Sequence, residues 1–81
     1  MTDDLILAVT AALAGEWDQA HRIVQELDDQ IARWIHAVLH KIEGDEGNSR
    51  YWYARARRNY EDFSDPNEEL RVIKQQLEKQ A

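Results

Sequence analysis

Apolar residues recur at helical spacing along almost the whole chain, and no segment alternates as a half-buried β-strand does. Glycine occurs only at positions 15, 44 and 47, and the single proline is Pro66, so helix breakers are few. The pattern therefore predicts an all-α fold. Five helices are expected over the approximate ranges 3–14, 17–28, 31–43, 48–61 and 65–81.

The boundary between the second and third helices is the least determined by the pattern. The apolar phase of the second helix continues into the third with almost no interruption at residues 28–30, so one long helix over 17–43 also fits. We expect a break, because Asp28 or Asp29 can cap the start of a new helix.

The fourth helix is expected to start at an Asn48 cap and to keep one apolar face as far as Phe63. The fifth has the clearest start, because Asp65 can cap it, Pro66 suits its first position, and Glu68 completes a capping box. Its narrow apolar stripe is Leu70, Ile73 and Leu77, with charged residues elsewhere. Such a helix is expected to cover an open end of the fold.

One turn occurs twice, as Gly15-Glu16-Trp17-Asp18-Gln19-Ala20 and, with substitutions, as Gly44-Asp45-Glu46-Gly47-Asn48-Ser49. The first copy resembles the turn of the tetratricopeptide repeat, in which two antiparallel helices flank a Gly-acid-aromatic-acid-x-Ala sequence. Leu7 and Ala8 fall at that family's first-helix packing positions, and the match extends over about residues 4–60. The spacing between the two glycines, 29 residues, is shorter than the family's repeat of roughly 34.

This resemblance implies a single domain with two antiparallel helical hairpins over 1–64 and a capping helix over 65–81. It also implies a scaffold that binds an extended peptide, a partner helix or a second copy of itself, and performs no chemistry. The segment from Trp34 to Tyr53 also resembles small uncharacterised proteins, which implies no function.

Composition narrows the function classes. The chain has 81 residues, a formal charge of -6 and no cysteine, which removes thiol catalysis, cysteine zinc sites and disulfides. An acidic chain argues against general nucleic-acid binding. The apolar stretch 5–14 is too short to span a membrane and follows two acids, unlike a signal peptide, so we expect a cytoplasmic protein.

Basic residues gather in one place. Residues 48–60 contain four arginines and no acid, namely Arg50, Arg55, Arg57 and Arg58. This patch suits an acidic protein partner or a second copy of the chain. Phosphate or RNA binding through the four arginines is an alternative, and a solvated face with surface ion pairs is the simpler interpretation.

His36 and His40 lie four residues apart on one expected helix face, with Glu43 three residues further on, and this spacing can hold a metal ion. His21 could supply another ligand from the second helix. The sequence favours a structural interpretation, in which His36 and His40 pack against the fourth helix and bond to hydroxyl or carbonyl groups there. No cofactor is therefore expected.

Tyr51, Trp52 and Tyr53 are consecutive, so they cannot all face inward on a helix. We expect Tyr53 in the core. A protein-binding surface is then predicted from aromatic and basic residues, which dominate such contacts: Tyr51, Trp52, Arg55 and Arg58, with Trp34 if a groove is open. Alternatively, the fifth helix buries Trp52. The sequence contains no recognisable Ser/His/Asp or Cys/His nucleophile motif and no glycine-rich phosphate-binding loop, so no enzymatic activity is expected.

Overall fold

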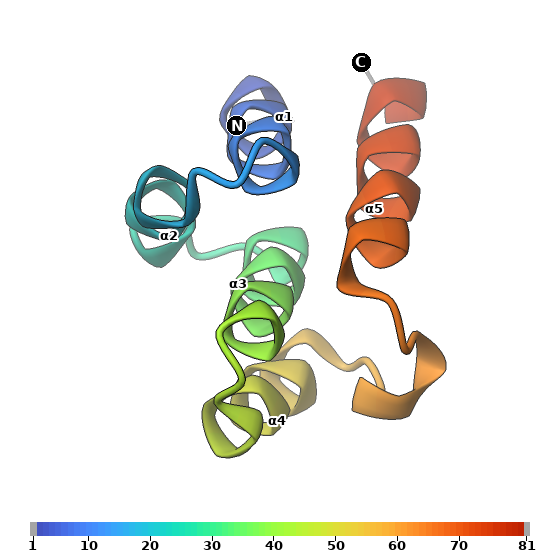
Figure 1. The fold of residues 1–81 in the computed structure, drawn as a ribbon. Helices are drawn as coiled ribbons and strands as arrows, with labels where there is room; N and C mark the ends of the chain where they lie inside the picture. Colours follow the sequence, from blue (N-terminus) through green and yellow to red (C-terminus); the bar gives the residue numbers. More distant parts are fainter. Residues whose placement is uncertain (1, 81) are drawn as a thin grey trace.

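The computed structural model describes residues 2–80, and these form α-helices joined by short turns (Figure 1). No β-strand occurs in this range, so the prediction of an all-α fold is confirmed. The helices are α1 (Thr2–Leu13), α2 (Trp17–Gln25), α3 (Gln30–Ile42), α4 (Glu46–Ala56) and α5 (Pro66–Gln80), with a 3-10 turn, η1 (Tyr60–Asp62), before α5.

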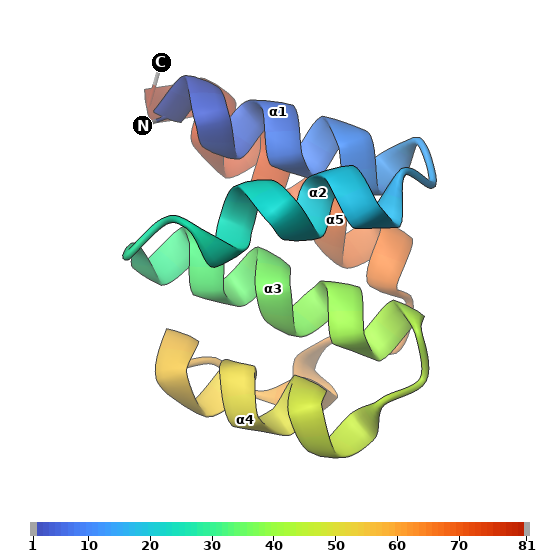
Figure 2. The same cartoon turned by 90° about the vertical axis from the view of Figure 1, so that its left-hand side faces the viewer.

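The first four helices run in alternating directions, so that α1 pairs with α2 and α3 pairs with α4 (Figure 2). The fifth helix was expected to cover an open end. It instead crosses one side of the stack and packs against α1 and α3 (Figure 1). The first helices of the two hairpins therefore share a face that α5 buries.

The two repeated turns have the same backbone conformation. Gly15 and Gly44 both have positive φ, 80° and 82°, which a residue with a side chain rarely adopts. In each turn the acid after the glycine donates its N–H to a carbonyl five residues earlier, Glu16 to Ala11 and Asp45 to His40. The second turn is thus a structural repeat of the first, although its sequence has diverged.

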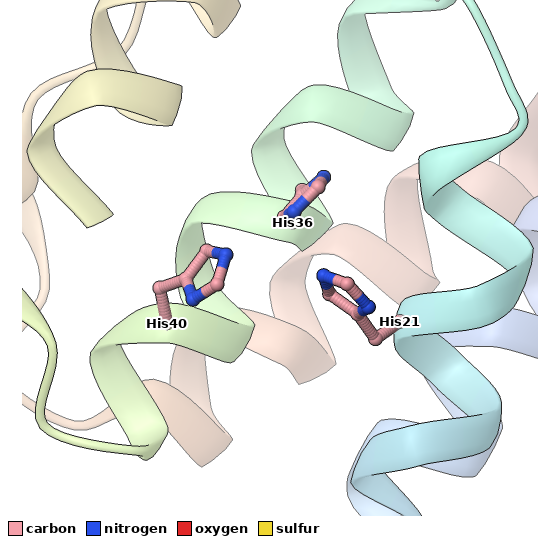
Figure 3. Close-up of side chains that lie close together, drawn as sticks. All are labelled: His21, His36 and His40. Carbon is pink, nitrogen blue, oxygen red and sulfur yellow. The ribbon is translucent and has the colours of Figure 1, made fainter. Parts of the chain in front are cut away.

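The predicted break between the second and third helices is confirmed. The Asp29 carboxylate accepts the backbone N–H groups of Ile31 and Ala32 and so caps α3. α2 ends at Gln25, three residues before the expected end. The chain reverses here, and α2 packs back on α3 with histidines facing one another (Figure 3).

The expected fourth helix was wrong at both ends. Asp45, not Asn48, caps α4, and Asn48 donates its backbone N–H to the Asp45 carboxylate. The helix ends at Ala56 because Arg57 adopts a left-handed conformation with φ 59°. Tyr60 and Phe63 therefore lie on the connection to α5 and do not continue the α4 face.

The core contains the aliphatic residues that the periodicity selected, with some exceptions. Leu70, Ile73, Leu77 and Tyr53 are buried as predicted. Leu7 is exposed, so the packing expected for it was wrong, and Ile42 at the end of α3 is exposed as well. Many buried positions are alanines, which let the helices approach closely: Ala8, Ala11, Ala12, Ala20, Ala32, Ala37 and Ala56.

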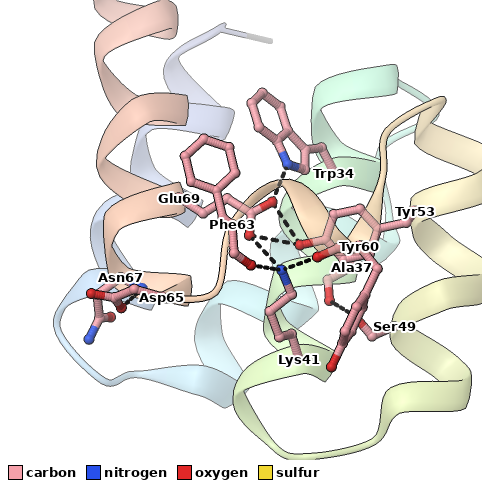
Figure 4. Close-up of polar contacts among 10 residues, drawn as sticks. All are labelled: Trp34, Ala37, Lys41, Ser49, Tyr53, Tyr60, Phe63, Asp65, Asn67 and Glu69. Atoms are coloured by element: carbon pink, nitrogen blue, oxygen red, sulfur yellow. Dashed lines mark hydrogen bonds and ion pairs between the residues drawn. The ribbon is translucent and has the colours of Figure 1, made fainter.

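A buried carboxylate joins three helices at the centre of the fold (Figure 4). Glu69 of α5 is only 1% exposed, although the sequence placed the charged residues of this helix in solvent. Its oxygens accept hydrogen bonds from Trp34 Nε1 at 2.8 Å and from the Tyr53 hydroxyl at 2.7 and 2.8 Å. Lys41 Nζ lies 2.9 Å from the same carboxylate.

Lys41 also holds the irregular connection before α5. Its ammonium donates to the carbonyl oxygens of Tyr60 and Phe63, each at 3.0 Å, and lies over the rings of Tyr53 and Tyr60. Burial, followed by the Glu69 carboxylate, raises the pKa of Tyr53, so its hydroxyl remains a donor. The charge of Glu69 is thus met by one cation and two neutral donors.

We expect Glu69→Ala to lower the free energy of unfolding by about 3–5 kcal/mol, because Lys41 would be left as a buried unpaired charge. Glu69→Gln, which keeps the shape, should also destabilise the protein. The exposed neighbour Glu68 is the matched control, and Glu68→Ala should change stability by less than about 0.5 kcal/mol. Urea unfolding followed by circular dichroism measures all three, and equal stability of the Glu69 and Glu68 variants would contradict this role.

Candidate functional site

Trp17 and His21 occupy successive turns of α2 on the face that meets α3. The Trp17 indole N–H donates to the Leu39 carbonyl oxygen at 2.7 Å, a bond that ties the start of α2 to α3. His21 stacks on this indole, with ring centroids 4.8 Å apart. The tryptophan therefore sets the position of the histidine ring.

His36 and His40 lie four residues apart on α3, and both are nearly buried, at 5% and 7% exposed. His36 stacks on Trp52 of α4, with centroids 3.9 Å apart. His40 Nδ1 lies 2.6 Å from a carboxylate oxygen of Glu43. Each ring is thus oriented by a partner outside the pair.

The three imidazoles converge on one another between α2 and α3 (Figure 3). Each histidine offers a ring nitrogen, and the three nitrogens all lie within 4.8 Å of one another. The sequence joined His36 and His40 by their spacing and named His21 as a possible further ligand, and the structure places all three together. His21 follows Trp17 by four residues, so the two side chains lie on the same face of α2.

The structural interpretation holds in part: His36 and His40 are buried and His36 packs against Trp52 of α4, but the expected hydrogen bonds to hydroxyl or carbonyl groups are not formed. Ser49 donates its hydroxyl to the Ala37 carbonyl oxygen at 2.7 Å, and the Tyr53 hydroxyl is bound to Glu69, so neither hydroxyl serves a histidine. Within residues 2–80, no hydrogen bond reaches the rings of His21 or His36. The hydrogen bonds expected for the histidines were therefore wrong.

Burial favours the neutral form of the His21 and His36 rings. Burial, together with the neighbouring His21 and His40, lowers the pKa of His36 to about 4. Burial and His40 also lower the pKa of His21, although the carboxylates of Glu43 and Asp18 oppose this. Neutral imidazoles repel one another little and carry lone pairs that can bind a metal ion.

A second group of possible oxygen and nitrogen ligands contains His40, Glu43 and Asp45. The Asp45 carboxylate accepts both the backbone N–H and the side-chain amide of Asn48, so it is engaged in capping α4. The bonds of Asp45 are those of a helix cap.

The predicted protein-binding surface is only partly exposed. Trp34 is 2% exposed and bonded to Glu69, so its place in an open groove was wrong, because α5 covers it. Trp52 is half-buried against His36, and α5 does not bury it. Tyr51 is 55% exposed, and the Arg55 guanidinium lies over its ring and that of Trp52.

The four arginines do not form one uniform basic surface. Arg50 is paired with Glu46 and Glu61, each at 2.7 Å. The Arg58 guanidinium lies 3.7 Å from the centre of the Trp34 ring, and Arg57 ends α4. Arg55 has no carboxylate within 4.0 Å among the residues that the structure covers.

Comparison of the chain with protein-family models, with curated proteins and with solved structures found no match. Over residues 2–80, each helix is either too short or too polar to cross a membrane. The function is therefore inferred from the geometry of the site.

The neutral His36 makes stability depend on pH. The unfolded chain binds a proton at this residue near pH 6.5 and the folded chain only near pH 4. Stability is therefore full above about pH 6.5 and falls as the pH is lowered toward 4. Between about pH 7.5 and 5, the wild type should lose about 1–2 kcal/mol more than a His36→Gln variant. Urea unfolding at each pH measures this difference, and parallel pH profiles for the two proteins would contradict it.

Proposed function

We propose that the protein binds a divalent transition-metal ion, with zinc as the test case, through the imidazoles of His21, His36 and His40. The observation that supports this most directly is the convergence of three ring nitrogens within 4.8 Å. Imidazole is a good ligand for zinc and its neighbours in the first transition series. Three histidine ligands are also a known zinc arrangement in enzymes.

The distances are close to those that coordination requires. In a tetrahedral zinc site with Zn–N bonds of about 2.05 Å, two ligand nitrogens lie about 3.4 Å apart. Starting from separations of at most 4.8 Å, each ring has to shift by less than ~1 Å. Small rotations of the side chains achieve this without moving α2 relative to α3.

Glu43 supports the same interpretation. A histidine that binds a metal with one nitrogen usually donates its other N–H to a carboxylate or carbonyl group. With Glu43 at 2.6 Å from His40 Nδ1, the Nε2 atom of this ring is the one left for the metal. Glu43 would thus be an orienting residue in the second coordination sphere.

The ring nitrogens of His21 and His36 have some contact with solvent. Every fully buried side-chain nitrogen or oxygen among residues 2–80 has a hydrogen-bond partner. Because the rings of His21 and His36 have no such partner, their nitrogens reach the surface. Water can bond to these nitrogens in the absence of an ion, and a metal ion entering the cluster would replace that water.

Zinc titration by isothermal calorimetry should show one ion bound per chain. His21→Ala or His40→Ala should abolish this binding, because only two of the three imidazole ligands would remain. Glu43→Gln should weaken binding about 10–100-fold, because the ring of His40 loses its orienting partner.

The matched control for these variants is Glu46→Gln, which removes an exposed acid of α4 from a position outside the cluster and should leave zinc affinity unchanged. Circular dichroism of each metal-free variant verifies folding. Zinc binding that survives loss of His21 and of His40 would rule out this site.

Protein binding is a second candidate, in line with the helical-hairpin scaffold that the sequence resembles. It is supported by the exposure of Tyr51 and by the unpaired Arg55 beside it, which suits the acidic surface of a second copy. Sedimentation over a concentration series tests it. Self-association that Tyr51→Ala removes would support this function, and a monomer at every concentration would exclude it.

A further inference from the structure

The segments at the two ends of the helical stack carry opposite charges. In Figure 2, α1 lies at the top of the stack and α4 at the bottom. Residues 2–18, which contain α1, have four acids and no lysine or arginine. Residues 47–58, which contain most of α4, have four arginines and no acid. Each segment is therefore electrostatically suited to the opposite end of a second copy of the chain.

α1 presents an unpacked leucine beside an acid. Leu7 is 51% exposed, and the other large apolar side chains that are exposed are Ile42 and Tyr51. Asp3 is also exposed and precedes Leu7 by four residues, so the two side chains are neighbours on one face of the helix. Within residues 2–80, no cationic group lies within 4.0 Å of the Asp3 carboxylate. This face thus offers an apolar side chain and a negative charge one helical turn apart.

A hollow large enough for one leucine side chain lies between the end of α2, the start of α3 and α4. Its volume is about 220 Å³, and the apolar part of its lining is Leu27 and the ring of Trp52. Both side chains are only partly buried. An aliphatic side chain entering the hollow would cover apolar surface that water otherwise contacts, which favours binding.

The charges around this hollow favour an acid. Arg33 is paired with Asp28 at 2.7 Å, so these two largely neutralise each other. Arg55 also lines the hollow, and over the described range 2–80 no carboxylate lies within 4.0 Å of it. Its guanidinium lies over the Trp52 ring, 5.5 Å from the centroid, beside the apolar lining. Glu26, the remaining charged residue of the lining, opposes an incoming acid.

We propose that this hollow receives Leu7 of a second copy and that Arg55 pairs there with Asp3 of the same copy. This inference rests on the second proposed function, self-association, and names the two surfaces that meet. Because the hollow and the α1 face are different surfaces, the contact is heterologous. Each copy then keeps one hollow or one α1 face for a further copy, so the copies join head to tail.

The proposed contact is small and does not involve the metal site. None of the three histidines lines the hollow, so association should occur without a metal ion. One aliphatic side chain and one ion pair bury much less surface than a standard protein interface. We therefore expect a dissociation constant of about 0.1–1 mM.

Sedimentation of the metal-free protein in EDTA, at concentrations up to about 2 mM, tests the contact. The average mass of the wild type should rise with concentration and pass that of a dimer. Leu7→Asp and Arg55→Asp should each raise the dissociation constant at least about tenfold. Ile42→Asp is the matched control, because it changes another exposed apolar side chain outside both surfaces and should leave association unchanged.

Mixing the two variants provides the sharpest test. Leu7→Asp retains an intact hollow, and Arg55→Asp retains an intact α1 face, so an equimolar mixture has one productive contact. It should form a one-to-one dimer and nothing larger, at concentrations where each variant alone is monomeric. Glu26→Gln in the otherwise unchanged chain should tighten association. Circular dichroism of each variant verifies folding.

The outcomes separate this inference from the function on which it rests. A wild type that is monomeric at every concentration would overturn both self-association and the proposed contact. Self-association that Leu7→Asp leaves unchanged, or that stops at a dimer, would overturn the contact alone. A mixture of the two variants that stays monomeric would also overturn it.

Discussion

The chain reversal between α2 and α3 is the constraint on which the site depends. In a continuous helix, His21 and His36 would lie about 22 Å apart, since each residue adds about 1.5 Å along the axis. The Asp29 carboxylate caps α3 and ends the competing helical path. The Trp17 indole N–H then donates a hydrogen bond to the Leu39 carbonyl oxygen and so holds α2 against α3. These two contacts convert a periodic apolar pattern into a pair of helices with facing imidazoles.

The polar contacts around Glu69 and the histidines of the candidate site lie on different sides of α3. Glu69, with its partners Lys41, Trp34 and Tyr53, joins α3, α4 and α5 on the side of α3 that faces the terminal helix. The histidines occupy the side that faces α2. His36 and His40 are buried in this interface, where the histidine rings stack on Trp17, on Trp52 and on one another.

Local patterns predicted much of this structure, and long-range contacts account for what they missed. Sequence alone predicted the helix periodicity, the glycine turns and the Asp29 cap, because each of them depends on residues close in sequence. The end of α4 was not predicted, since Arg57 takes a left-handed conformation there and Lys41, about twenty residues earlier in the sequence, holds the connection that follows. The burial of Glu69 was missed for the same reason, and with it the burial of Trp34.

The candidate site also combines a local pattern that could be predicted with long-range contacts that could not. The i, i+4 spacing joined His36 to His40, whereas His21 and Trp52 enter through the packing of three helices. X-ray absorption of the zinc-loaded protein after removal of free metal tests the account most directly. We expect the spectrum to show three imidazole nitrogens at about 2.0–2.1 Å from the zinc ion and one oxygen ligand. A zinc ion surrounded by oxygen atoms alone, or no retained zinc, would contradict it.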